Sequence, residues 1–361
     1  MLNNYIKKSS YKSVRNYRLI ADDLYISDQN KIIYKVNKDG TVFVIMEGLP
    51  ETSWLAVSGK YLLFRSIRKN ELTYFDTQLK KIEFFTLPEV KSCSFIYPYE
   101  FKSDFTIVAS INTSEERKAL AVDLDLKQIK IEFQFRILGS FLSNDSAIFS
   151  ILLENDEQFL FSADRKTGSL NWRLNLSSNG EIRKLLGIVN NLPWVTCYLK
   201  ESLTKTYHTL LALDVKTGEI IFSRNDMPYF HSSACVLNES NNTIISILRR
   251  FDQTFFLELD ALSGNIIREQ QLTELEEKGF VFGGANNLTL YKDKLYMVVT
   301  AVKTIFGKTL AILDLSDLSI PWISKVTEGK ATISRDPEVT DTHLYVLDTE
   351  NTLHIFEKES M

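Results

Sequence analysis

Cysteine and histidine are scarce in this chain of 361 residues, which limits the chemistry that its side chains can perform. Cys93, Cys197 and Cys235 lie far apart in apolar stretches, a pattern that predicts buried free thiols. The four histidines show no H-x-x-H or H-E-x-x-H spacing, so the sequence predicts no metal site. His354 alternates with apolar residues inside a predicted strand, and we interpret it as a structural or surface histidine.

Other signals are also missing. No P-loop, G-x-S-x-G or dinucleotide-binding glycine pattern occurs, and no apolar run reaches the ~18 residues of a membrane span. The first residues carry no apolar stretch typical of a secretory signal, which favours a cytoplasmic location. A net charge of −4 and a pI near 5.8 argue against general affinity for nucleic acid. We therefore expect no catalytic site, cofactor, metal, nucleic acid or membrane partner.

A repeated unit is present instead, and its clearest copy is FSADRKTGSLNWRL. This stretch predicts two strands joined by the turn from Asp164 to Gly168, with Trp172 on the second strand. The aspartate side chain can accept hydrogen bonds from turn amides, and glycine tolerates positive φ. D-x-x-T-G therefore predicts a tight hairpin turn.

The same unit returns at Asp214, Asp260 and, without its glycine, Asp314. The residues eight positions after the four aspartates are Trp172, Phe222, Arg268 and Trp322. Weaker copies are found at Asp76 and Asp123, and an earlier hairpin turn lies around Asp39. The seven turns are 37 to 54 residues apart, which brackets the ~40–50 residues of a propeller blade.

Each repeat also contains two apolar runs before its marked hairpin, which gives four strands per repeat. Such a sheet must pack against its neighbours on both faces, so the sequence predicts an all-β, single β-propeller of four-stranded blades over residues 1–361. Eight blades are favoured, at 17–47, 54–86, 95–134, 136–174, 182–223, 231–270, 280–325 and 331–358; seven blades are the alternative. The last blade lacks a strand, and residues 4–14 are the candidate that would complete it and close the ring.

The strand, D-x-x-T-G and strand-with-tryptophan pattern resembles the PQQ-like repeat over essentially the whole chain. That repeat forms the blades of quinoprotein dehydrogenases and of an outer-membrane-protein assembly lipoprotein. The resemblance implies the fold and leaves activity open. The quinoproteins are glycine-rich and exported, with a vicinal disulfide and a calcium site, whereas this chain has 14 glycines and no adjacent cysteines. We therefore expect a member of the family without a cofactor.

A binding face is predicted on one rim, where the loops between second and third strands meet the loops between blades. The basic candidates of this rim are Lys200, Lys205, Arg249, Arg250, Lys303 and Lys308. Acidic residues of corresponding loops are Glu154, Asp156, Glu157, Asp348 and Glu350. This separation of charge suits one oriented protein partner with an acidic surface. Tyr229 and Phe230 are candidate aromatic anchors, although Phe230 could instead pack between blades.

The sequence thus favours a non-enzymatic, monomeric, protein-binding propeller of a bacterial cytoplasm. The most specific hypothesis is an immunity-type protein that binds and neutralises a toxin or effector. One alternative is a propeller hydrolase or lyase with its site at the central axis, and another is a scaffold or assembly factor.

Overall fold

The computed structural model describes residues 5–359, apart from 38, 49–54, 66–69, 88–89, 96–105, 113–116, 136, 155–156, 177–179, 201–205, 226, 228–229, 284–287, 303 and 305–306. Almost all regular structure in these residues is β-strand. The chain divides into two compact units. We call Met1–Val14, Thr196–Leu211 and Phe222–Met361 the terminal unit, and Arg15–Val195 with Ala212–Ile221 the central unit. The prediction of one domain over residues 1–361 stays a prediction.

Sheets of the central unit are simple meanders, because consecutive strands are joined by short turns and pair with each other. The strands of the first two sheets are β2 (Val14–Ile20), β3 (Asp23–Asp28), β4 (Ile33–Val36), β5 (Val42–Met46), β6 (Leu55–Ser58), β7 (Tyr61–Arg65), β8 (Glu71–Asp76) and β9 (Lys81–Thr86). Those of the next two are β10 (Val90–Phe95), β11 (Thr106–Asn112), β12 (Arg117–Asp123), β13 (Gln128–Phe133), β14 (Ile137–Ser143), β15 (Ala147–Glu154), β16 (Glu157–Asp164) and β17 (Leu170–Asn175).

The following sheet has residues in both units. It consists of β18 (Glu181–Val189), β19 (Leu192–Lys200), β20 (Thr206–Leu213) and β21 (Ile220–Arg224), in that order.

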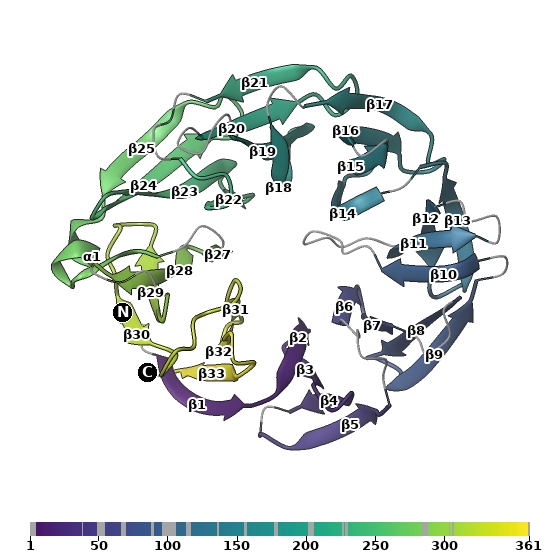
Figure 1. The fold of residues 1–361 in the computed structure, drawn as a ribbon, viewed down its shortest axis with the longest axis horizontal. Coiled ribbons are helices and arrows are strands. Elements are labelled where there is room, and N and C mark those ends of the chain that lie inside the picture. The colour runs from purple at the N-terminus through teal and green to yellow at the C-terminus, as the bar shows by residue number, and fades with distance from the viewer. Residues whose placement is uncertain are drawn as a thin grey trace. The chain divides into compact units, whose positions relative to one another are not determined.

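Sheets of the terminal unit continue the meander, with β23 lying between β22 and β24 (Figure 1). The strands are β22 (Cys235–Asn238), β23 (Thr243–Arg250), β24 (Gln253–Asp260), β25 (Ile266–Gln271), β26 (Phe280–Phe282), β27 (Leu288–Tyr291), β28 (Lys294–Ala301), β29 (Thr309–Asp314), β30 (Trp322–Lys325), β31 (Glu338–Val339), β32 (His343–Leu347) and β33 (Leu353–Lys358). A short helix, α1 (Thr273–Glu277), follows β25.

The prediction of eight four-stranded blades is wrong. Within the described residues, seven sheets have four strands each, whereas the sheet of β26 to β30 has five. Both β26 and β27 pair with β28, at Phe282↔Val299 and Leu288↔Met297. Met297 and Val299 are two residues apart on β28, whereas their partners Leu288 and Phe282 are six residues apart. An insertion therefore divides the first strand of this sheet in two. In the sequence, GGANN separates the apolar runs FVF and LTLY, but this spacing does not show that both runs pair with the same strand.

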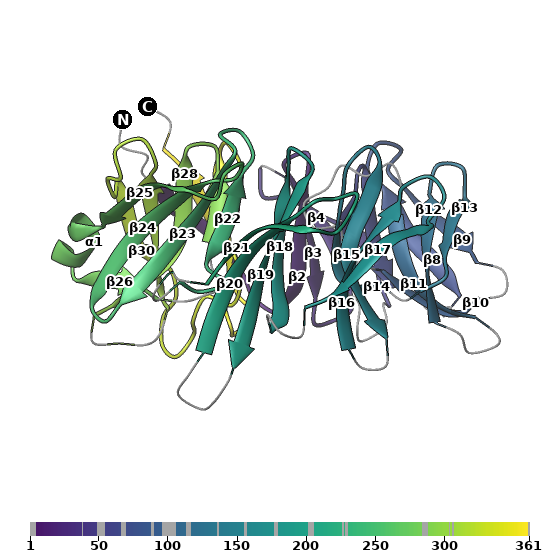
Figure 2. The ribbon, with the colours of Figure 1, turned by 90° about the horizontal axis from the view of Figure 1, so that it is seen from above.

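The N-terminal strand β1 (Tyr5–Tyr11) completes the sheet of β31 to β33. It pairs antiparallel with β33, from Tyr5↔Lys358 to Tyr11↔Leu353, and the two chain ends lie near each other (Figure 2). Tyr5 is buried, and its hydroxyl is 3.0 Å from that of Tyr296.

The D-x-x-T-G turns form as predicted. In the first, Asp164 Oδ1 accepts hydrogen bonds from the N–H of Lys166 and of Thr167, and the Gly168 N–H bonds back to the Asp164 carbonyl. Gly168 has a φ of +72°, a left-handed value that glycine adopts without strain. The same contacts recur at Asp214.

The residues eight positions after Asp164, Asp214 and Asp260 contact the turn of the following repeat. A Cβ on Gly218 would lie 2.6 Å from the Trp172 ring, so this contact excludes any side chain there. Trp172 Nε1 also donates to the Val215 carbonyl, 2.9 Å away. An aromatic residue at this position of the repeat is predicted to be buried at the same place in each blade; Trp322 is buried, whereas Trp172 is half-buried.

The apolar core lies between successive sheets. In the central unit, Ala119 and Phe133 of one sheet form a cluster with Phe141, Ile148 and Phe161 of the next. Cys197 and Cys235 are buried free thiols, as predicted, and the side chain of Cys93 lies outside the described residues. Helices of the described chain are too short and too polar to cross a bilayer.

Candidate functional site

Only part of the predicted binding rim lies within the described residues. Lys205, Tyr229 and Lys303 fall outside them, as does the side chain of Lys200. Phe230 is described and is 2% exposed. It packs in the interior, which removes it from the surface candidates and corrects that interpretation.

The remaining basic candidates are Arg249, Arg250 and Lys308, and all three have partners. Arg250 forms an ion pair with Glu269, 2.7 Å away, and its guanidinium lies 4.5 Å from the centre of the Phe255 ring. Arg249 Nε donates to the Phe251 carbonyl at 2.9 Å, and Lys308 Nζ donates to a backbone carbonyl. Glu269 therefore balances the charge of Arg250. The positive charge of the predicted rim is smaller than the sequence indicated.

The acidic loops of the predicted rim also differ from expectation. Glu157 is exposed, whereas Asp348 is buried, and the Asp348 carboxylate accepts hydrogen bonds from the Glu350 and Thr352 N–H groups. Asp348 also lies 2.9 Å from Nε2 of the buried His354. Asp348 therefore shapes its own turn, and His354 is a structural histidine, as predicted. The Glu154 side chain and Asp156 lie outside the described residues.

A different residue stands out at the tip of the β23–β24 hairpin. Arg250 and Gln253 are the last paired residues, so the loop between the strands is Phe251 and Asp252 alone. Phe251 is 83% exposed, the highest value among the large hydrophobic side chains that the structure describes. Exposure of an aromatic ring to water is unfavourable in free energy, and burial of the ring against a partner would remove that cost. We call Arg249 to Asp252 the Phe251 hairpin.

The backbone of this hairpin is strained at the same residue. Phe251 has a φ of +56°, a region that glycine, asparagine and aspartate favour in two-residue hairpin loops. A bulky side chain there costs about 1–3 kcal/mol and persists only where the surroundings enforce it. Arg249 helps to hold this conformation, because its guanidinium donates a hydrogen bond to the Phe251 carbonyl and also lies 3.4 Å from the Phe282 carbonyl. Exposure and strain thus coincide at one aromatic residue.

The sequence contained a signal that could have identified Phe251. The run TIISILRR-FD-QTFFLELD places only two residues between two strands, and neither is glycine or asparagine. The basic pair before the turn drew the prediction to Arg249 and Arg250 instead. Loop length was not evident, because strand ends are the least certain part of a sequence pattern.

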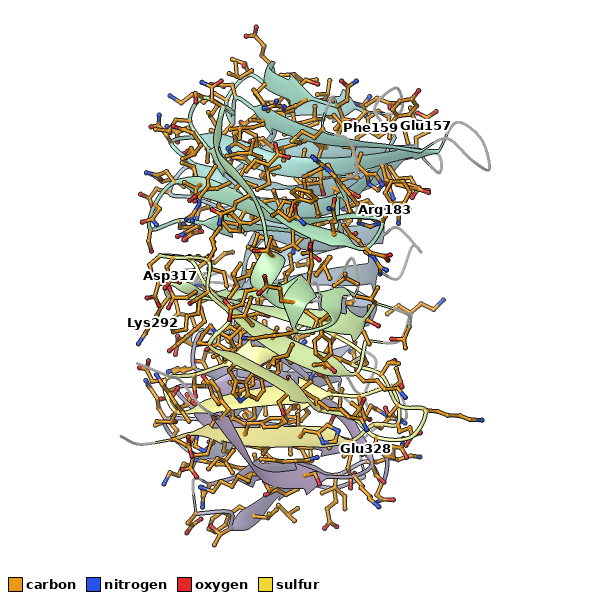
Figure 3. The ribbon with its side chains drawn as sticks, turned by 90° about the vertical axis from the view of Figure 1, so that its left-hand side faces the viewer. Glu157, Phe159, Arg183, Lys292, Asp317 and Glu328 are labelled. Carbon is orange, nitrogen blue, oxygen red and sulfur yellow. The ribbon has the colours of Figure 1, made fainter. Side chains whose placement is uncertain are left out.

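Charged residues lie at both ends of the strands in the terminal unit. Lys292 and Asp317 are turn residues at one end, and Glu328 lies toward the other end (Figure 3). Lys292 forms an ion pair with Asp341, and Lys325 forms one with Glu328. Paired surface charges of this kind contribute little to stability.

A cluster of aromatic and imidazole rings also lies in the terminal unit. The His208 and His231 rings are 4.5 Å apart, and His208 lies 5.1 Å from the Tyr198 ring. His208 Nδ1 accepts the Ser232 N–H at 3.0 Å, which places the ring proton on Nε2. Ser232 is buried, so its hydroxyl is out of reach of a substrate. Within the described part of the chain, no group of three or more His, Cys, Asp or Glu could hold a metal ion.

No family model matches this chain, and no curated protein matches it. Solved structures do resemble it over 98% of its length. BamB from Moraxella catarrhalis is 13% identical with a TM-score of 0.57, and 100% of that chain is covered. Quinohemoprotein alcohol dehydrogenase from Comamonas testosteroni is 9% identical with a TM-score of 0.61, and 76% of that chain is covered. Both are β-propellers built from PQQ-like repeats.

This chain has the β-propeller fold. The computationally designed protein Ika8 is also similar, at 11% identity and a TM-score of 0.62, with 99% of that chain covered. The likeness supports the PQQ-like repeat at the level of the fold. It does not extend to activity, because one fold serves many functions.

Replacing His354 with glutamine is expected to reduce the loss of stability between pH 7 and pH 5. Burial holds the pKa of His354 below its ordinary value of 6.5, and Lys7 lowers it further, while the hydrogen bond to Asp348 opposes the shift. The unfolded chain therefore takes up a proton more readily, and the free energy of unfolding falls as the pH drops below 6.5. Urea unfolding at several pH values measures this slope. Equal slopes in the parent and the variant would show that His354 does not cause it.

Proposed function

We propose that this protein is a non-enzymatic, protein-binding propeller and that the Phe251 hairpin is an anchor of its contact surface. The observation that carries the proposal is the 83% exposure of Phe251 in a left-handed backbone conformation. Strained backbone conformations cluster at functional sites, so an exposed aromatic residue in such a conformation is a candidate for binding. Aromatic residues and arginine are also enriched among the residues that dominate binding energy.

The charges around Phe251 suit a protein partner better than a small anion. Arg249 binds only backbone carbonyls in the contacts described above and keeps its positive charge, whereas Arg250 is balanced by Glu269. Asp252 adds an exposed negative charge at the tip. Mixed charge around an apolar anchor resembles the polar rim and apolar centre of protein interfaces.

At the finer level, we propose an immunity-type protein that binds and neutralises a toxin or effector inside a bacterial cell. Partner-specific binding without chemistry is what such a role requires, and the hairpin would supply it. Expression of the partner alone should then arrest growth, and co-expression of this protein should restore it. A partner whose expression is harmless would overturn the toxin interpretation while leaving protein binding in place.

Replacing Phe251 with alanine is expected to weaken the complex with the native co-purified partner by about 2 kcal/mol, or roughly 30-fold. The loss should appear as faster dissociation, because a desolvated anchor acts on the lifetime of a complex. Leu262→Ala is the matched control: Leu262 is 51% exposed and lies in the turn at the opposite end of β24. Surface plasmon resonance measures both variants. Equal affinity for parent and Phe251→Ala would remove the hairpin from the interface.

Phe251→Gly separates binding from folding. Glycine adopts positive φ without strain, so this variant is expected to be about 1 kcal/mol more stable than the parent. It should nevertheless lose affinity as Phe251→Ala does. Higher stability together with unchanged affinity would contradict the proposed role of Phe251.

A further inference from the structure

The fourth strand β5 of the central unit differs from the other fourth strands in its sequence. Val42, Phe43 and Val44 are consecutive and are 49%, 58% and 58% exposed. Three consecutive exposed apolar residues on a strand are a surface that native proteins normally avoid. The strand ends its sheet in the order β2-β3-β4-β5 (Figure 1). One edge of β5 thus remains available for pairing.

The other fourth strands are protected by charge. Each of them that the structure describes carries at least one lysine, arginine, aspartate or glutamate, and β5 alone carries none. The protecting residues are Lys7 and Lys8 on β1, Lys81 and Glu83 on β9, Lys130 and Glu132 on β13, Arg173 on β17, Arg224 on β21, Arg268 and Glu269 on β25, and Lys325 on β30. Charged residues at a sheet edge discourage pairing with another chain. Their absence from β5 marks this edge as different.

The hydrogen-bonding groups of β5 that face outward follow from its register. The Asn37 N–H donates to the Thr41 carbonyl at 2.9 Å, so these two residues form a hydrogen-bonded pair. Antiparallel pairs alternate between bonded and non-bonded. Lys35↔Phe43 is then the next bonded pair, while Val42 and Val44 lie in non-bonded pairs. The N–H and C=O groups of Val42 and Val44 therefore point away from β4.

We propose that the edge of β5 binds an extended apolar segment of a partner protein, flanked by lysine or arginine, through β-strand addition. Val42 and Val44 would each donate one hydrogen bond and accept one, while Val42, Phe43 and Val44 would supply apolar contact on both faces. The ends of the site are acidic. Asp39 and Glu47 are exposed, and hydrogen bonds from the side chain and backbone of Thr41 lower the pKa of Asp39. A segment with basic flanks would match them.

A second copy of this chain fits less well. In a two-fold antiparallel pairing centred on Phe43, Asp39 of one copy would face Glu47 of the other, and like charges in opposed positions are destabilising. A strand of five residues is also only about 17 Å long. Such an edge covers much less than the ~800 Å² per partner of a stable interface. Charge and size thus both favour a short segment with basic ends.

The test uses an end-capped, fluorescent nine-residue peptide of alternating threonine and valine between terminal lysines, with fluorescence anisotropy as the readout. The full chain is expected to bind this peptide at least tenfold more tightly than the same peptide with terminal glutamates. Val44→Pro removes an outward N–H without breaking a bond to β4, and it should weaken binding at least tenfold. Val44→Thr keeps the N–H and the side-chain shape and should stay within about threefold.

Val44→Lys gives β5 a charged residue, as the other fourth strands have, and should also abolish binding. The test therefore does not depend on the folding of the proline variant. Equal binding by Val44→Pro and the parent, or equal binding of the two peptides, would overturn the proposal. Sedimentation velocity tests whether a second copy of this chain binds the β5 edge instead. A concentration-dependent dimer that Val44→Lys abolishes would make the second copy the occupant and overturn the proposal. Neither result bears on the Phe251 hairpin, which belongs to the terminal unit and to a different test.

Discussion

Deleting residues 1–12 is expected to lower the free energy of unfolding by about 5 kcal/mol or more. The deletion removes β1, and with it the buried Tyr5 that contacts Tyr296 and Trp322. Loss of a buried aromatic side chain alone typically costs about 3–5 kcal/mol. The edge of β33 and the buried side chain of Phe356 would also become exposed to water. Urea unfolding followed by circular dichroism measures the change.

A peptide of residues 1–12 added in trans should restore much of the lost stability, because it can pair again with β33. Ile6→Lys serves as the control for the whole segment. Ile6 is 57% exposed, so this change should stay within about 0.5 kcal/mol. An unchanged midpoint after the deletion would mean that β1 contributes nothing to stability.

Trp322→Ala is expected to cost about 3–5 kcal/mol, the usual range for a large buried aromatic side chain. Trp322 is 8% exposed, and its ring meets those of Tyr5 and Phe356 edge-on at 5.7 Å and 5.9 Å. Trp322 Nε1 also donates to the Tyr5 carbonyl at 3.3 Å. Removal of this side chain therefore empties a packed site and leaves that carbonyl without its indole partner. Chemical denaturation, with the midpoint and slope both fitted, tests the value.

Two further variants separate the causes of this loss. Trp322→Phe keeps most of the packing and removes the indole N–H, so a smaller loss of about 1 kcal/mol is expected from the hydrogen bond. Trp172→Ala should cost less than Trp322→Ala, because Trp172 is half-buried. An equal loss at both tryptophans would contradict the difference in burial that separates them.

The sequence predicted the repeat well because its turns are local. Asp164, Thr167 and Gly168 bond among themselves within a few residues, so the D-x-x-T-G spacing contains all the information that the turn needs. Alternating apolar residues likewise define each strand. Even Leu318, which occupies the glycine position of the fourth copy, adopts the same left-handed φ of 60°. The turn therefore forms without glycine there, at the strain that a bulky residue accepts in this region.

The candidate site was predicted less well, because exposure and pairing depend on residues distant in the chain. Arg250 reads as a free rim charge, but the strand pairing places Glu269 beside it. Asp348 reads as an acidic loop residue, but the fold buries it next to His354. Phe230 and Phe251 both read as loop aromatics, and the structure places one inside and the other in water. The two-residue spacing marks the Phe251 turn, but it does not show which of the two aromatic side chains is buried.

The sequence by itself determined that this protein is all-β, that its strands form meandering sheets, and where the seven marked hairpins turn. Those features follow from the period of two along a strand and from turn chemistry, which act over a few residues. Only the tertiary structure decided that the first strand of one sheet is divided, that Phe251 is exposed in a strained turn, and that the uncharged β5 is the last strand of its sheet. Burial and edge position arise when whole sheets pack, so they are properties of the assembled chain.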